Sequence, residues 1–318
     1  MNGARRVHTP TASRAEVVER TRTSLAPPRL SSLPAERDQL EYSSRSIAFA
    51  SDGGRLLRAW GPPERPWLLA VEARGDRWQV DAWGADAPTA RSAARALFSL
   101  DHPLEEFYRL VRRDRVLAGT ERRFRGLRLP RDANLYESLV HAIVGQQLSV
   151  VAANAIQRRL FERTGSTLEA DGIEVPCPPS PERLAGLGEA GLRSVGLSGA
   201  KARALTALAG RWPDLARRAR SLAVGPLDRA RSSLTELPGV GPWTAENALL
   251  RGAGRRDVFV AGDLGVRVAL DRYGVLPRTA PEARARAWAE RQYPGWGSYA
   301  TLYLWRRLVT ESRAAAAG

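Results

Sequence analysis

LPGVGPWTA, residues 237–245, is the stretch of this sequence that decides the fold. Gly239 and Gly241 lack a Cβ atom, so the turn that contains them can take positive φ angles and expose its amides. Pro242 suits the first position of the next helix, whose N-terminal end carries partial positive charge and attracts anions. The pattern predicts two helices joined by a hairpin that contacts a nucleic-acid phosphate. On its own it predicts no chemistry.

A second segment, DVFVAGDLGVR at residues 257–267, follows the hairpin and places Asp263 directly before an expected helix over residues 264–270. A phosphate-binding hairpin followed about twenty residues later by such a carboxylate resembles the helix-hairpin-helix DNA glycosylase superfamily. Within it, the hairpin and the DVF segment are most similar to the bacterial 3-methyladenine-DNA glycosylase II family. AIVGQQLS at 142–149 and WGSYA at 296–300 extend the resemblance to most of residues 43–312.

The resemblance implies a mainly α fold with a small N-terminal α+β domain and two helical lobes that face each other across a cleft. We expect a flexible tail at residues 1–42, an α+β cap domain at 43–103 and a helical glycosylase core at 104–318. Within that core, lobe one covers about 130–255 and contains the hairpin. Lobe two combines 104–129 with 256–318.

Local patterns agree with this division. Polar residues and alternating charges in residues 1–42 lack periodicity, apart from one short helix expected near 14–22. Segments 46–50, 67–71 and 78–83 are short, apolar or alternating, and a turn signal at 73–76 predicts a hairpin between the last two. A helix over about 89–98 should cover this sheet. The pattern is helical from Leu104, with a first helix expected to reach Leu117.

Composition favours a compact intracellular protein with a polyanionic partner. The net charge is +15 and the pI about 11.1, although an arginine-rich proteome would raise both. The sequence contains no run of eighteen apolar residues and no apolar signal core. Cys177 is the only cysteine, so it cannot supply the four thiolates of an iron–sulfur cluster, and the three scattered histidines make a zinc site improbable.

Asp263 is the residue on which the expected mechanism depends. The resemblance implies that it is catalytic. A carboxylate beside C1′ of a deoxyribose lowers the barrier to breaking the bond to the base, because positive charge develops on the sugar. Asp263 could act as an electrostatic stabiliser or as a general base towards water, and the sequence leaves both open. The alternative is a helix cap alone, a role compatible with catalysis. A cap or loop role is expected for Asp257.

Lysine usage predicts the type of cleavage. Lys201 is the only lysine among 49 basic residues, and a glycosylase that also cuts the backbone needs a deprotonatable amine for a Schiff base. In the bifunctional relatives a lysine occupies the position of Trp243. We therefore expect a monofunctional enzyme that leaves an abasic site. Lys201 itself is expected to face a phosphate at a helix start, or solvent.

The resemblance implies further site residues. The DNA backbone is expected to contact Leu237, Gly239, Val240, Gly241 and Thr244. Gln147 and Leu148 are both candidates for the wedge that fills the gap left by a flipped base, and the sequence does not separate them. Gln147 could instead be a buried residue that satisfies a helix end.

Four residues are expected to line the base pocket: Trp243, Asn247, Leu264 and Trp296. An electron-rich aromatic ring attracts the positive charge of alkylated purines. Because Asn247 and Leu264 stand where the best-known member has tyrosines, the pocket should be less aromatic than in that relative. Either tryptophan could instead be ordinary core. Tyr299 and Trp305 are expected to pack the last helix.

The sequence thus predicts a monofunctional DNA glycosylase for alkylated bases of the 3-methyladenine and 7-methylguanine type. Its partner is double-stranded DNA with damaged bases, and no membrane or oligomer is required, so we expect a monomer in the cytoplasm of a bacterium, associated with the nucleoid. No cofactor is expected, although a metal ion at the hairpin carbonyls is compatible with the sequence. The alternatives are a non-catalytic protein that binds damaged or structured DNA, and a glycosylase for deaminated or oxidised bases.

Overall fold

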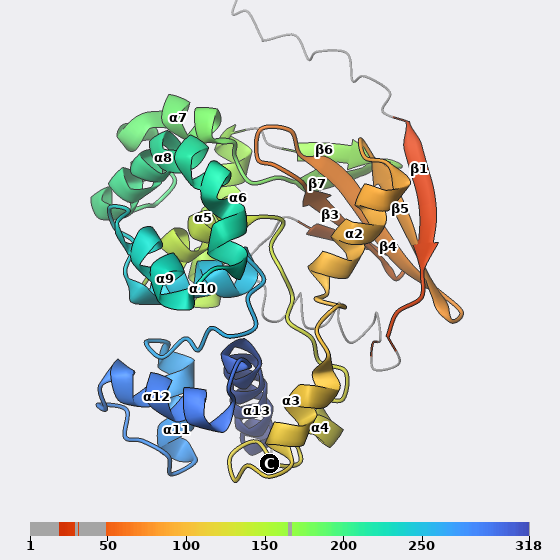
Figure 1. Cartoon of the computed structure of the whole chain (residues 1–318). Coiled ribbons are helices and arrows are strands. Elements are labelled where there is room, and N and C mark those ends of the chain that lie inside the picture. Colours follow the sequence, from red (N-terminus) through yellow and green to blue (C-terminus); the bar gives the residue numbers. More distant parts are fainter. Residues whose placement is uncertain (1–18, 29–30, 32–48, 165–166, 318) are drawn as a thin grey trace, which may run out of the picture.

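The computed structural model describes residues 19–28, 31, 49–164 and 167–317. They form an antiparallel sheet with a covering helix, and two lobes of helices beside and below it (Figure 1). The predicted mainly helical fold with a small N-terminal sheet is confirmed. No described helix has the length and apolar character needed to cross a membrane.

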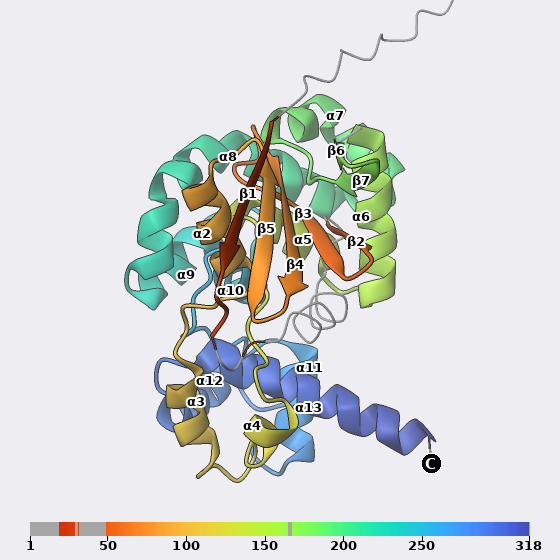
Figure 2. The same cartoon turned by 90° about the vertical axis from the view of Figure 1, so that its right-hand side faces the viewer.

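The sheet has the strand order β1-β5-β4-β3-β2, and all neighbours are antiparallel (Figure 2). Its strands are β1 (Arg20–Leu25), β2 (Phe49–Asp52), β3 (Arg55–Trp60), β4 (Trp67–Arg74) and β5 (Arg77–Trp83). The turn expected at 73–76 joins β4 to β5, and β3 is a strand that the sequence did not predict. The segment expected at 46–50 is described only from residue 49. α2 (Ala87–Leu97), capped by the Asp86 side chain, packs its alanines and Leu97 on one face of the sheet.

The prediction of a flexible tail is wrong for residues 20–25. They form the edge strand β1 and pair with β5 along their whole length. The helix expected near 14–22 therefore does not form at residues 20–22, and residues 14–18 lie outside the described chain. Arg20 and Arg22 donate to the buried Asp81 of β5 at 2.6 and 2.8 Å. This cross-strand charge pairing replaces the apolar alternation that usually signals a strand.

Lobe one consists of helices that surround a fully buried central helix, α5. Its helices are α5 (Leu135–Gly145), α6 (Val150–Thr164), α7 (Pro181–Ser194), α8 (Gly199–Val224), α9 (Leu227–Thr235) and α10 (Pro242–Arg251). Between α6 and α7, the strands β6 (Thr167–Ala170) and β7 (Ile173–Pro176) form a second hairpin. It packs on the sheet face opposite α2, with Val175 against Leu57 and Leu68. Lobe one is thereby attached to the N-terminal sheet.

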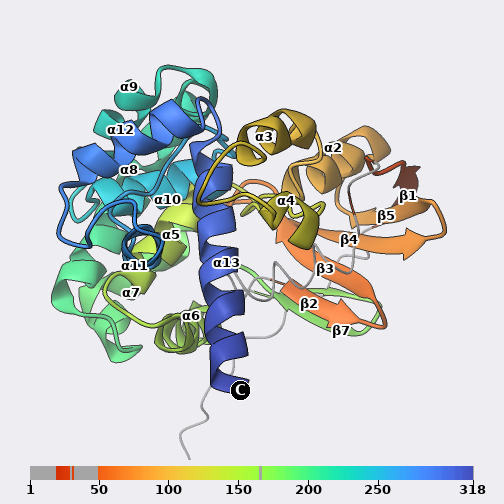
Figure 3. The same ribbon diagram turned by 90° about the horizontal axis from the view of Figure 1, so that it is seen from below.

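Lobe two is built around the last helix. Its helices are α3 (Leu104–Val111), α4 (Thr120–Arg123), α11 (Leu264–Arg272), α12 (Glu282–Gln292) and α13 (Gly297–Ala317). α13 lies between α3 and α4 on one side and α11 and α12 on the other (Figures 1 and 3). Its Tyr303 packs against Phe107 and Tyr108 of α3. α3 ends at Val111, earlier than predicted, because the Asp114 side chain accepts from the amides of Val116 and Leu117 and forms a turn.

Candidate functional site

The predicted hairpin, residues 237–241, joins α9 to α10 on lobe one. Gly239 has φ +76°, and a Cβ there would lie 2.6 Å from Cβ of Ala204 on α8, so both conformation and space require glycine. Gly241 has φ −86° and open space around it, so only one of the two glycines uses a positive φ. Gly241 is the N-cap of α10 and brings no side chain to cover the helix end.

The five residues expected at the DNA backbone fall into two groups. Gly239 and Gly241 are exposed, and their amides donate to no group in the described chain, so they are open to a phosphate. Leu237 and Val240 are buried and anchor the hairpin in the core. Thr244 is also buried, and its hydroxyl accepts a hydrogen bond from Gln146 instead of facing solvent.

Asp263 lies where the segment from lobe one enters lobe two, and it caps α11 by accepting from the amide of Val266. The Nε1 atoms of two tryptophans donate to its carboxylate: Trp243 of α10 to Oδ2 at 3.1 Å and Trp305 of α13 to Oδ1 at 2.8 Å. Asp263 is 6% exposed, and within the described residues its carboxylate forms no ion pair. One tryptophan from each lobe therefore fixes a buried anion by neutral N–H groups alone.

Trp305 is a site residue that the sequence analysis missed. It was expected only to pack the last helix, yet its indole N–H is half of the tryptophan pair on Asp263. Its position, 42 residues after Asp263 on a helix of mixed apolar spacing, carries no local signal for this contact.

The expected base-pocket residues are only partly brought together. Trp243 contacts Asp263, and the Asn247 side chain donates back to the Trp243 carbonyl one helical turn earlier. Leu264, next to Asp263, is 71% exposed. Trp296 lies in the lobe-two core, 3% exposed, with the Arg256 guanidinium 4.7 Å from its ring centroid. No described contact joins Trp296 to Asp263 or Trp243.

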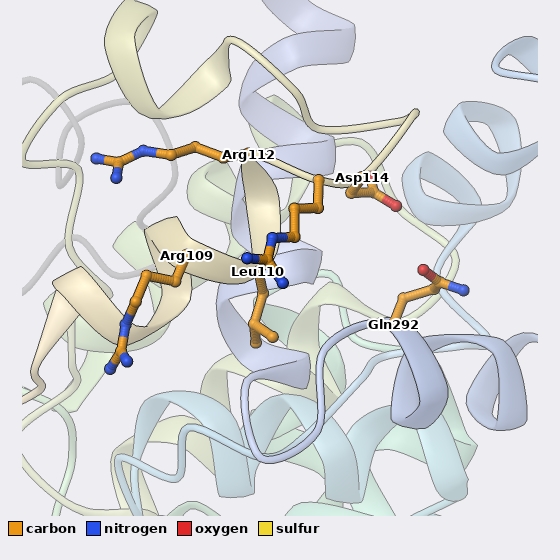
Figure 4. Close-up of a pocket in the computed structure, with 6 residues that line it drawn as sticks. Arg109, Leu110, Arg112, Asp114 and Gln292 are labelled. Carbon is orange, nitrogen blue, oxygen red and sulfur yellow. The ribbon is translucent and has the colours of Figure 1, made fainter.

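The space beside Trp243 is small. A cavity of about 10 Å³ is lined by Trp243, Asn247, Arg251, Asp132 and residues of α5, which is room for one water molecule. A wider pocket of about 500 Å³ lies elsewhere in lobe two, between the end of α3 and Gln292, and contains none of the predicted site residues (Figure 4). A nucleobase therefore needs the region around Trp243 and Leu264 to widen.

The two wedge candidates differ in placement. Gln147, in the loop between α5 and α6, is exposed and has φ +54°, a conformation that few residues other than glycine adopt. Leu148 is partly buried and packs against the main core. Gln147 is therefore the residue that projects, and it is not the buried glutamine of the alternative interpretation.

Asp257 forms a bidentate ion pair with Arg255 at 2.9 and 2.6 Å. The same guanidinium donates to the last carbonyls around the end of α8, including that of Gly225 at 2.8 Å. Asp257 thus holds a loop in place and lies apart from the tryptophan pair.

Within the described chain, one group of side chains has the ligand types and proximity of a metal site: Asp132, Glu137 and His141, all buried. Arg58 of β3 reaches both carboxylates, with Nη2 2.8 Å from Glu137 and 3.4 Å from Asp132. Burial alone would raise the pKa of Asp132, but neighbouring His141 and Arg58 hold it well below its usual range. The guanidinium already supplies the positive charge that a metal would bring.

Comparison with known proteins relates this geometry to a family. Residues 140–292 match the model of the HhH-GPD superfamily, described as base excision DNA repair proteins. Over this segment, just under half of its length, the chain resembles this superfamily.

Two curated relatives are each 35% identical to the chain. The Mycobacterium tuberculosis "Probable bifunctional transcriptional activator/DNA repair enzyme AlkA" matches over 225 residues, 70% of this chain and 43% of that protein. The Escherichia coli "DNA-3-methyladenine glycosylase 2" matches over 185 residues, 57% of this chain and 60% of that protein. The chain thus spans about half the length of these relatives.

A solved structure agrees on the fold. The 3-methyladenine DNA-glycosylase from Archaeoglobus fulgidus superposes with a TM-score of 0.77 over 90% of this chain and 98% of that one, at 24% identity. The shared fold includes both lobes and the N-terminal sheet, since so much of each chain is covered.

Proposed function

We propose that this protein removes alkylated bases of the 3-methyladenine and 7-methylguanine type from double-stranded DNA and leaves an abasic site. The observation that carries the proposal is the buried carboxylate of Asp263, fixed by Trp243 and Trp305 and unpaired with any cation in the described chain. The superfamily match supports base excision repair, and the name of the Escherichia coli relative, DNA-3-methyladenine glycosylase 2, supports the substrate class.

The geometry supports an electrostatic role for Asp263. As the bond between C1′ and the base nitrogen breaks, both electrons go to the base, and positive charge develops on the sugar. A cationic alkylated base leaves as a neutral molecule, so no proton has to be delivered to it. Water then bonds C1′ and loses a proton to solvent. Both carboxylate oxygens of Asp263 accept hydrogen bonds, which fix its orientation and occupy its acceptor sites, so stabilisation is favoured over general-base catalysis.

DNA is held by the hairpin in this proposal. The unpaired amides of Gly239 and Gly241 face the phosphate at the start of α10, and the net charge of +15 draws the duplex to the protein. Gln147 enters the stack when the damaged nucleotide turns out towards Asp263. The small cavity beside Trp243 widens as the base enters, and the indole face then meets the cationic ring.

Cleavage stops at base removal in this proposal, because the only lysine amine of the sequence is engaged with backbone carbonyls. Nζ of Lys201, the only lysine, donates to the carbonyls of Val144 and Gln146 at 2.9 and 2.7 Å. Borohydride should therefore trap no covalent complex with damaged DNA. A trapped adduct would contradict the monofunctional assignment.

Duplexes with single lesions test the proposal. Each is incubated with the protein and then heated in alkali, which breaks the strand at abasic sites, and the breaks are counted above those of the same duplex treated without protein. Breaks at 7-methylguanine or 3-methyladenine are expected. Breaks only at uracil, hypoxanthine or oxidised guanine would reassign the substrate, and binding without breaks at any lesion would show a binding protein without turnover.

A further inference from the structure

The loop between α5 and α6, residues 146–149 and here called the finger loop, contains a strained residue. Gln147 has φ +54° and is exposed, so its own side chain gains nothing that offsets this backbone conformation. Such a conformation persists only where neighbouring groups hold it. Two polar side chains of the described chain do so, one on each side of the loop.

Lys201 holds the loop from the side of α8. Its Nζ donates to the carbonyls of Val144, at 2.9 Å, and of Gln146, at 2.7 Å. Carbonyls at the end of a helix lack partners within it and carry partial negative charge. The single lysine of the chain therefore caps α5, a role different from the phosphate or solvent contact expected from the sequence.

Gln146 holds the loop from the side of the hairpin. Its Nε2 donates to the carbonyl of Gly239 at 2.9 Å and to Oγ1 of the buried Thr244 at 2.9 Å. Both protons of the side-chain amide are used. One acceptor lies in the hairpin and the other in the first turn of α10, which follows it. The residue directly before Gln147 is thus bonded to the hairpin.

The first turns of α8 complete the connection. Ala204 lies one turn after Lys201 and contacts Gly239 so closely that a Cβ on that glycine would be 2.6 Å away. One face of α8 therefore supports the finger loop through Lys201 and the hairpin through Ala204. The loop, the hairpin and α8 form a closed set of three contacts.

We propose that Gln146 and Lys201 are positioning residues that join the finger loop to the hairpin, so that phosphate binding at Gly239 and Gly241 and insertion of Gln147 occur as one event. The inference rests on the proposed function, because it assigns insertion to Gln147. It adds two residues that touch neither the base nor the sugar. They act by fixing the position of Gln147 relative to the hairpin when the hairpin binds the DNA backbone.

The test uses Gln146→Leu, which keeps the size and removes both donors, and Lys201→Met, which keeps the stem and removes the charge. Gln292→Leu on lobe two and Arg211→Met further along α8 are matched controls, since both residues are exposed and outside the site. Insertion is read from the fluorescence of 2-aminopurine next to an abasic-site analogue. Single-turnover excision, affinity for undamaged duplex and the melting temperature are measured alongside.

Each of the two variants should lower insertion and single-turnover excision by about tenfold to a hundredfold, the effect of one or two hydrogen bonds. Affinity for undamaged duplex should stay within about threefold, because the amides of the hairpin remain. The double variant should lose no more insertion and excision than the more impaired of the two single variants, because the two residues act as one unit. The controls should match the wild type.

Wild-type insertion in either variant would overturn the proposal. The proposal would also be overturned if the loss of excision were proportional to the fraction of unfolded protein. It would equally be overturned if insertion and affinity for undamaged duplex fell by the same factor. The abasic analogue keeps this test separate from the proposed function. If the wild-type protein inserts Gln147 but excises no base, the proposed glycosylase activity is refuted. The link between the finger loop and the hairpin can still be tested by insertion.

Discussion

Two buried aspartates near Trp243 are held in different ways. Asp132 lines the small cavity beside Trp243, and Asp263 accepts from its indole N–H. Asp132 is bound by the guanidinium of Arg58, with His141 and Ser138 around it, whereas Asp263 is bound by neutral N–H groups only. The Asp132 carboxylate, whose charge is compensated by a guanidinium, joins parts of the fold. The Asp263 carboxylate has no cationic partner in the described chain, so its charge is available to stabilise a cation in the site.

The Asp132 cluster joins the N-terminal sheet to lobe one. Arg58 is a residue of β3 and 1% exposed, while Asp132 and Glu137 lie before and within α5. The Glu137 side chain also accepts from the amide of Ala133 at 2.8 Å, which fixes the start of α5. The same helix ends at the finger loop, so the sheet helps to hold the helix that carries the loop.

The largest expected change in stability comes from Arg58→Met. It leaves two buried carboxylates without their cation, which should cost about 3–5 kcal/mol of unfolding free energy. Denaturant titration measures this, and Arg74→Met is the control, because the exposed Arg74–Glu72 pair should matter by about 1 kcal/mol or less. Excision per folded molecule should be nearly unchanged. Wild-type stability in Arg58→Met would show that the cluster is not a tie.

Mild acid should destabilise the protein through His102 and leave the Asp132 tie intact, because the pKa of Asp132 is held low. Burial and the nearby Arg131, Arg256 and Arg128 lower the pKa of His102 to about 4. Between pH 6.5 and 4 the unfolded chain binds the proton more tightly, so stability falls as the pH falls, by up to about 3 kcal/mol.

His102→Gln should remove this slope and retain a partner for the Tyr299 hydroxyl, which lies 3.0 Å from the ring nitrogen Nδ1. Unfolding free energies at several pH values between 4 and 7 give the comparison. An unchanged slope in the variant would assign the acid sensitivity to other groups.

Trp305→Phe tests whether neutral donors hold Asp263 in its active position. The ring stays and the N–H is lost, which should slow single-turnover excision by about tenfold to a hundredfold. Affinity for damaged duplex should not change. Trp288→Phe is the control, since that indole packs edge-to-face against Phe259 and Tyr293 in the same lobe. Equal rates in the two variants would remove Trp305 from the site.

The smallest effect on stability and excision is expected from Asp257→Asn, which changes an aspartate outside the pair compared above. Asp257 is one-third exposed and asparagine keeps a hydrogen-bond acceptor for the buried Arg255, so stability should fall by only about 1 kcal/mol. Excision should stay at the wild-type rate, because Asp257 is apart from the tryptophan pair. A large loss of excision with normal folding would make Asp257 a second catalytic carboxylate.

Sequence reasoning reached the parts of the site that local chemistry encodes. The glycine hairpin, its following helix and the capping aspartate each depend on residues a few positions apart. The Arg58–Asp132 pair joins residues 74 positions apart, Lys201 reaches a carbonyl 55 positions away, and Trp305 reaches back 42. No local pattern reports such contacts. β1 was missed for the same reason, since the partner of its arginines lies about sixty residues further along.

Single-turnover excision of 7-methylguanine by Asp263→Asn tests the central claim most directly. Asparagine keeps the shape and the cap of α11 but carries no charge. Excision should slow by about 10²-fold to 10³-fold or more, while affinity for the same duplex and the melting temperature stay close to wild type. Excision at the wild-type rate in this variant would contradict the account.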